Sequence, residues 1–149
     1  MFKHMLVPVD GSATSMLALE RARTLASALG SAITVIYVLD PYPFTGIGSE
    51  FAYGQEQYLQ AATQEAESVL ATAREKLSGS PGAVDVRVVE SVAPWRGIIE
   101  AADTVGADLI VMGSHGRRGL EKLVLGSVTQ SVLTHSPITT LVVRGPADD

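Results

Sequence analysis

The sequence has 149 residues, a formal net charge of −5 and no cysteine, and 46% of its residues are hydrophobic but only 5% aromatic. This length and composition predict one domain, residues 1–149, with an aliphatic core; the missing cysteines exclude disulfides and thiolate metal sites, and the negative charge argues against a nucleic-acid partner. No apolar run reaches the roughly 18 residues that cross a membrane and no signal peptide is recognisable, so we expect a cytoplasmic protein without a membrane partner.

The first forty residues show the pattern of a strand, a helix and a second strand. Residues 3–9 form a short apolar run that ends at Asp-Gly, which predicts a buried strand. The helix that follows has leucines and alanines at helical spacing, Ser12 or Thr14 as its N-cap and Gly30 as its stop. The β-branched run 31–40 predicts a second strand, joined to the first in a parallel βαβ unit.

The middle of the chain continues this alternation after an irregular stretch. Residues 41–54 contain two prolines, three glycines and four aromatic residues, which predicts a loop. A long helix over about 55–78 leads to residues 84–90, where valines alternate with charged residues as in a strand at a sheet edge. A short helix then begins at Pro94.

The last third of the chain holds two more strands and a helix. The apolar run 107–113 predicts a central strand that is covered on both faces. Residues 127–136 predict a helix and residues 138–144 a final strand. Five strands alternating with four helices predict an α/β fold, in which right-handed crossovers place helices on both faces of an open parallel sheet.

Two of the predicted strands end in residues that suit a ligand. In an open parallel sheet, ligands bind beyond the carboxyl ends of the strands, at the point where the strand order reverses. The first strand ends in VPVDGS, which includes Asp10, and the fourth ends in VMGSHG, where Gly113 and Gly116 permit close backbone approach. After nine further residues, Gly126 and Ser127 open a helix whose N-terminus could hold a phosphate.

The glycine spacing differs from two familiar phosphate-binding motifs. The sequence has neither GxxxxGK[ST] nor a GxGxxG after its first strand, which argues against a P-loop NTPase or a dinucleotide dehydrogenase. Its spacing is instead G-2x-G-9x-G-[ST]. Together with VPVDGS at 7–12 and MGSHGRRGLEKLVLGSVTQSVL at 112–133, this spacing resembles the universal stress protein family over essentially the whole chain.

The resemblance implies a Rossmann-like sheet of order 3-2-1-4-5, in which the first and fourth strands are neighbours. It also implies membership of the subgroup that binds ATP, with Mg²⁺ as a further candidate. Adenine would lie near Val38, Pro8 and Val9, and Asp10 would meet the ribose or a metal. The residues implied for the ribose and the phosphates are Met112, Gly113, His115, Gly116, Arg117, Gly126, Ser127, Val128 and Thr129.

Several of these residues also have a simpler interpretation. Asp10 could cap the first helix, and the cluster of Arg117, Arg118 and Lys122 could be a solvated loop face. His115 could act as a base near neutral pH, but the sequence assigns it no orienting acid, so we expect it to contact the ligand through its backbone. No catalytic residue is therefore assigned.

The sequence predicts a nucleotide-binding regulatory protein of the stress response, with a slow ATPase or an adenylyl-transferring enzyme as the alternative. We expect Val at Gly113 or Gly126 to block the phosphates and leave the fold intact. The final strand has no internal charge and lies at the sheet edge in the implied order, and the family commonly dimerises through it. We therefore expect a homodimer with Thr140 to Val142 near its axis, which Leu141→Pro would disrupt.

Overall fold

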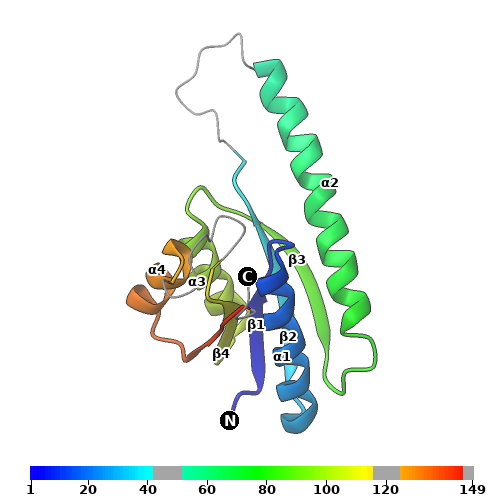
Figure 1. The fold of residues 1–149 in the computed structure, drawn as a ribbon, viewed down its shortest axis with the longest axis vertical. Coiled ribbons are helices and arrows are strands. Elements are labelled where there is room, and N and C mark those ends of the chain that lie inside the picture. Colours follow the sequence, from blue (N-terminus) through cyan, green and yellow to red (C-terminus); the bar gives the residue numbers. More distant parts are fainter. Residues whose placement is uncertain (42–51, 116–124, 146–149) are drawn as a thin grey trace.

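The computed structural model describes residues 1–41, 52–115 and 125–145, and these form alternating strands and helices (Figure 1). The strands are β1 (His4–Pro8), β2 (Ala32–Leu39), β3 (Val84–Glu90), β4 (Leu109–Gly113) and β5 (Thr140–Val143). The helices are α1 (Ala13–Leu29), α2 (Ala52–Lys76), α3 (Pro94–Val105) and α4 (Ser127–His135). Every strand and helix predicted from the sequence is present. None of the helices within the described ranges is long and apolar enough to cross a membrane.

The last strand is shorter than expected because its first residues form a local turn. The N–H of Ile138 donates to Ser136 Oγ at 3.1 Å, and the Thr140 hydroxyl donates back to the Ile138 carbonyl at 3.1 Å. Pro137 has no N–H to give to a ladder. Regular pairing with β4 therefore begins at Thr140, opposite Ile110.

The five strands form one parallel sheet of order β3-β2-β1-β4-β5, as expected. β1 pairs with β2 on one side, where His4 lies opposite Ala32, and with β4 on the other, where Met5 lies opposite Leu109. The order of the strands thus reverses between β1 and β4. β3 and β5 are the edges, which confirms the edge position predicted for residues 84–90.

Alternate side chains of the sheet enter two separate cores, as a period of two requires. One core lies under α1 and α2, and the other under α3 and α4, on the opposite face. β4 is buried along its whole length, which confirms the central strand predicted there. The first core includes Met5, Val7, Leu19, Val35, Leu70 and Val111. The second includes Leu6, Ile36, Ile98, Ile110 and Val132.

Helix α1 begins at a side-chain cap and ends at a left-handed glycine. Ser12 is the N-cap, and its hydroxyl accepts from the N–H of Ser15 at 3.2 Å. Gly30 adopts φ 71° and donates its N–H to the Ala26 carbonyl at 2.7 Å. Thr14, the other N-cap candidate, instead buries its side chain, which is only 5% exposed.

The end of β4 packs directly against this buried threonine. A Cβ at Gly113 would lie 2.8 Å from Thr14 Cγ2 and 3.3 Å from the Thr14 carbonyl oxygen. Gly145, just beyond β5, is equally close, because its Cβ would lie 2.7 Å from Thr14 Oγ1. Both glycines leave room for the first turn of α1 on the sheet.

Gly113→Ala should therefore destabilise the protein by about 1–3 kcal/mol, since one extra methyl group overpacks the contact with Thr14. Thermal unfolding measures this as a lower Tm. Gly54→Ala is the matched control: Gly54 lies in α2 with open space around its Cβ position, so this change should preserve the Tm or raise it through helix propensity. An unchanged Tm in Gly113→Ala would mean that the contact is not a close fit.

The Asp108 carboxylate ties the start of β1 to the turn before β4. Its two oxygens accept from the backbone N–H groups of Lys3 and His4, each at 3.0 Å. The His4 hydrogen bond is the main cause that lowers the pKa of Asp108 below its usual value of 3.8; slight burial opposes it and the Lys3 hydrogen bond adds to it. A lowered pKa in the folded state means that this carboxylate stabilises the fold above its usual pKa and loses that effect as the pH falls.

Asp108→Asn should lower the Tm by a few degrees at pH 7, because the amide retains only one acceptor oxygen and no charge. The difference from wild type should shrink as the pH falls from about 4 through the lowered pKa of the folded state, because the wild-type carboxyl then also loses its charge. Asp103→Asn, at an exposed position in α3, serves as the control. A difference in Tm that stays constant from pH 7 to pH 3 would contradict the role of the charge.

Candidate functional site

The carboxyl end of β1 leads into a turn that the Asp10 side chain builds. Asp10 Oδ1 accepts from the N–H of Ser12 at 2.9 Å, and the Asp10 N–H donates to Ser15 Oγ at 3.2 Å. Just before it, Val9 is held against β2 by a 2.8 Å hydrogen bond to the Ile36 carbonyl. Asp10 thus supports the turn into α1 but is not its N-cap. Its half-buried side chain lies at the carboxyl end of β1, beside the end of β4.

The N-terminus of α4 is joined to the end of β4 by two hydrogen bonds, and a third joins the end of β4 to β5. Ser114 donates its N–H to the Val143 carbonyl at 2.8 Å, which extends the β4–β5 pairing by one residue. The Ser114 carbonyl in turn accepts from Gly126 at 2.7 Å. The buried Thr129 hydroxyl donates to the Gly113 carbonyl at 2.8 Å. Thr129, which the resemblance suggested as a phosphate contact, thus uses its side chain to position the helix.

Helix α4 starts without a side-chain cap. Its N-cap is Gly126, which has no side chain to offer, in contrast to Ser12 at the start of α1. In the first turn, Ser127 is exposed and Val128 half-buried. A helix start without a side-chain cap presents backbone N–H groups and the positive end of the helix dipole, an arrangement that attracts anions.

The His115 ring is held between two hydroxyl groups. Its Nε2 lies 3.4 Å from Thr14 Oγ1 at the start of α1, and its Nδ1 lies 3.2 Å from Ser114 Oγ. Gly145 passes the same ring, since its Cβ would lie 3.5 Å from His115 Cε1. These contacts position His115, the second residue of the β4–α4 connection, and neither of the two ring contacts involves an orienting carboxylate.

Two glycines of the predicted motif, Gly113 and Gly126, lie in close packing contacts. Gly113 makes room for Thr14, as described above, and a Cβ at Gly126 would lie only 3.1 Å from His115 Cα. A Cβ at Gly113 would first meet the Thr14 side chain and one at Gly126 the His115 backbone, so we now expect Val at either position to disturb the packing as well as the proposed phosphate site. No sequence signal could have shown this, since Thr14 is distant from Gly113 along the chain.

A hollow of 440 Å³ lies beyond the end of β2, beside α2 and the start of α3. Val38, which the family resemblance placed near the adenine, is one of its lining residues. The other residues that line this hollow were not predicted from the sequence. An acid at the end of a strand, the signal used for Asp10, would have found Asp40, but nothing in the sequence placed α2 there. The other lining residues are Tyr37, Leu39, Tyr58, Ala61, Ala62, Glu65 and Pro94.

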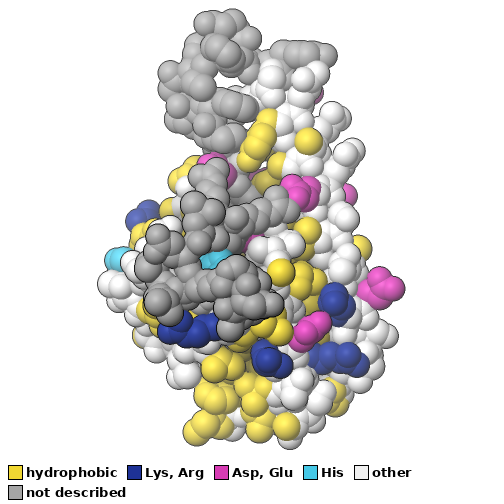
Figure 2. Space-filling view, viewed as in Figure 1, with side chains coloured by type: hydrophobic (Ala, Val, Ile, Leu, Met, Phe, Trp, Pro, Cys, Tyr) yellow, Lys and Arg dark blue, Asp and Glu magenta, His cyan; other side chains and the backbone are white. Residues whose placement is uncertain are grey.

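Four residues of the predicted cluster, Gly116, Arg117, Arg118 and Lys122, lie outside the described residues. Within residues 1–41, 52–115 and 125–145, no group of three or more His, Cys, Asp or Glu side chains could hold a metal ion. On the face seen in Figure 2, side chains of both charges are intermixed. Lys76 Nζ lies 3.6 Å from a carboxylate oxygen of Glu20.

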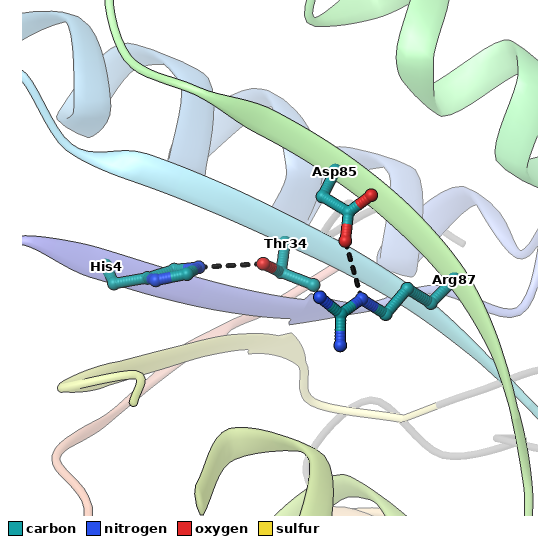
Figure 3. A network of polar contacts seen from close by, with 4 residues as sticks. All are labelled: His4, Thr34, Asp85 and Arg87. Carbon is teal, nitrogen blue, oxygen red and sulfur yellow. Dashed lines mark hydrogen bonds and ion pairs between the residues drawn. The ribbon is translucent and has the colours of Figure 1, made fainter. Parts of the chain in front are cut away.

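A separate polar group lies toward the amino ends of the strands (Figure 3). His4 Nε2 is 2.7 Å from Thr34 Oγ1, and Arg87 pairs with Asp85 at 2.5 Å. His4 is the first residue of β1, and Thr34 lies opposite Asp85 near the starts of β2 and β3. The His4–Thr34 contact therefore links β1 to β2 at the amino end of the sheet, whereas the Arg87–Asp85 pair lies within β3.

Comparison with known proteins gives consistent matches over almost the whole chain. The model of the universal stress protein family matches residues 1–144. Universal stress protein MJ0531 of Methanocaldococcus jannaschii is 32% identical over 146 residues, which cover 98% of this chain and 84% of that protein. The solved structure of MJ0577, from the same organism, superposes with a TM-score of 0.83 at 27% identity and covers 99% of both chains. A universal stress protein solved in complex with cAMP superposes with a TM-score of 0.68 at 25% identity, over 96% of this chain and 97% of that one.

The family model, the curated relative and the shared sheet order agree with the motifs at the ends of β1 and β4, and the chain belongs to the universal stress protein family.

Proposed function

We propose that this chain is an ATP-binding regulatory protein of the stress response, with the nucleotide held at the switch point between β1 and β4. The observation that carries the proposal is the start of α4, which lacks a side-chain cap and is fastened to the end of β4 at the edge where β1 also ends. Such a helix start is an anion site. The relative solved with cAMP supports an adenine nucleotide as the ligand.

In this proposal the backbone at the start of α4 holds the phosphates and the strand ends hold the nucleoside. Asp10 accepts a ribose hydroxyl or contributes one carboxylate to a nucleotide-bound Mg²⁺, whose other ligands would be phosphate oxygens and water. Thr129 acts through the Gly113 carbonyl. The adenine lies near Pro8, Val9 and Val38, the ribose and phosphates near Met112, Gly113 and His115, and the phosphate chain at Gly126, Ser127 and Val128, with Gly116 and Arg117 as further proposed contacts.

A binding role is favoured over an enzymatic one by the surroundings of His115. Hydrolysis needs a positioned water and a base, and the ring nitrogens of His115 contact the Thr14 and Ser114 hydroxyls. The alternative is a slow ATPase or an adenylyl-transferring enzyme on the same fold. The cytoplasmic location expected from the sequence stays a prediction.

Ser127→Glu should weaken ATP binding at least tenfold, or about 1.4 kcal/mol, because it places a carboxylate in the proposed phosphate site. The helix itself should tolerate the change, since acidic residues are favourable in a first turn. Titration calorimetry measures the affinity. Thr134→Glu, exposed near the other end of α4, is the matched control and should bind ATP as wild type does.

Equal ATP affinity in Ser127→Glu and wild type would place the nucleotide elsewhere. Sustained release of ADP by the wild-type protein, at the roughly 1 to 1,000 turnovers per second of typical enzymes, would favour the enzymatic alternative. We expect far slower release.

We further propose a homodimer formed by antiparallel pairing of two β5 edges. The carbonyls of Thr139 and Val143 accept from β4, at 2.9 and 2.8 Å. The backbone N–H and C=O groups of successive residues point to opposite sides of a strand. Those of Thr140 and Val142 therefore point to the open edge of the sheet. Leu141, whose side chain is 41% exposed, directs its backbone to β4. A two-fold axis at Leu141 would place Thr140 of one copy opposite Val142 of the second.

The alternation also changes the substitution that tests the dimer. Leu141→Pro, expected from the sequence to disrupt the dimer contact, would first remove an N–H that faces β4 and would damage the fold. Val142→Pro removes an N–H at the open edge, where proline is tolerated, so sedimentation should show a folded monomer. Val142→Ala keeps the N–H and should remain a dimer. A dimeric Val142→Pro would assign the interface to another surface.

A further inference from the structure

The hollow beyond β2 has the size and the walls of a site for a flat heterocycle. Its 440 Å³ falls in the range of ligand pockets. Two tyrosines, Tyr37 and Tyr58, stand among small apolar side chains of α2 and the start of α3. Aromatic rings of this kind pack against a base by stacking or by edge-to-face contact. Because Val38 lines the same hollow, a base held there would be continuous with the proposed nucleotide site.

The polar groups that face this hollow include two carboxylates, Asp40 and Glu65. An ionised carboxylate only accepts hydrogen bonds, so it attracts an N–H donor and repels a carbonyl oxygen. Neither side chain lacks an interaction partner. A carboxylate has about four lone-pair sites, however, so each can accept a further hydrogen bond.

Asp40 is the better placed of the two acids. It lines the hollow together with Val38, which lies two residues before it. It is half-buried, whereas Glu65 is exposed on α2. Its side chain is also the shorter, so less conformational freedom is lost when it makes a fixed contact. A hydrogen bond at Asp40 is therefore less weakened by competing water.

We propose that Asp40 is a specificity-determining residue, whose carboxylate accepts an N–H from the exocyclic amino group of a base in the hollow. This inference rests on the proposed nucleotide function. Adenine carries a 6-amino donor, and hypoxanthine carries a 6-carbonyl oxygen at the same place. One carboxylate thus favours ATP by attraction and disfavours ITP by leaving two acceptors face to face.

Titration of the wild-type protein with ATP and ITP tests the inference directly. ATP should bind roughly tenfold more tightly, the effect of one hydrogen bond to a charged group. Equal affinity, or tighter binding of ITP, would overturn the role of Asp40 and leave the proposed function standing. Tighter binding of GTP than of ATP would also overturn it, because the carboxylate would then be reading the N–H groups of guanine. Failure of all three nucleotides to bind would refute the proposed function itself.

Asp40→Asn assigns the preference to this residue. The carboxamide can donate as well as accept, so the ratio of ATP to ITP affinity should fall toward one, chiefly through tighter ITP binding. Asp103→Asn removes the same charge near the far end of α3, which begins at the hollow with Pro94, and should keep the wild-type ratio. A wild-type ratio in folded Asp40→Asn would overturn the inference.

If Asp40→Asn does not fold, as judged by circular dichroism, the wild-type protein is instead titrated with the triphosphate of purine riboside. This ligand has no group at position 6, so it should bind the wild-type protein more weakly than ATP and more tightly than ITP. Binding equal to that of ATP would show that the amino group is not recognised.

Discussion

The parallel pairing of β1 with both β2 and β4 is the constraint from which the rest of the structure follows. From β1 the chain runs outward through β2 to β3, and it then returns to β4 and β5 on the other side of β1. Right-handed crossovers place α1 and α2 over one face and α3 and α4 over the other. β1 and β4 are parallel neighbours, so both strands end at the same end of the sheet. Two turns, from Asp10 into α1 and from Gly113 toward α4, begin side by side at this edge.

Several residues that the sequence suggested as ligand contacts instead take part in the packing where β1 and β4 end. Thr14 fills the space beside Gly113 and Gly145, and its hydroxyl faces His115. Thr129 holds the Gly113 carbonyl. The glycine spacing therefore serves first to bring α1, β4 and α4 within van der Waals contact. It fixes the direction of the α4 N-terminus, so the motif can contribute to an anion site without each glycine touching the anion.

The helices and strands could be predicted because they depend on residues close together in the sequence. The features that could not be predicted depend on contacts between distant residues. Ser12 and Thr14 were both N-cap candidates because both hydroxyls lie close to the start of the helix; the structure makes Ser12 the cap and packs Thr14, inside the first turn, against the end of β4. The strand order came from a family resemblance, since sequence periodicity does not say which strands are neighbours. The hollow could not be predicted, because it needs the placement of α2 beside the end of β2. The direction of the Leu141 backbone depends on register with β4, which no single strand encodes.

The two ends of the proposed nucleotide site differ in how strongly they depend on side-chain identity. At the phosphate end, the groups offered are backbone N–H donors at the start of α4, and any sequence that keeps the close packing of Gly113 and Gly126 presents them. At the base end, Asp40 and the tyrosines of the hollow act through their side chains. A single substitution there changes the pattern of donors and acceptors without disturbing the helix start. The glycine spacing therefore indicates that phosphate can be held, whereas the choice of base depends on residues outside that motif, at the end of β2 and along α2.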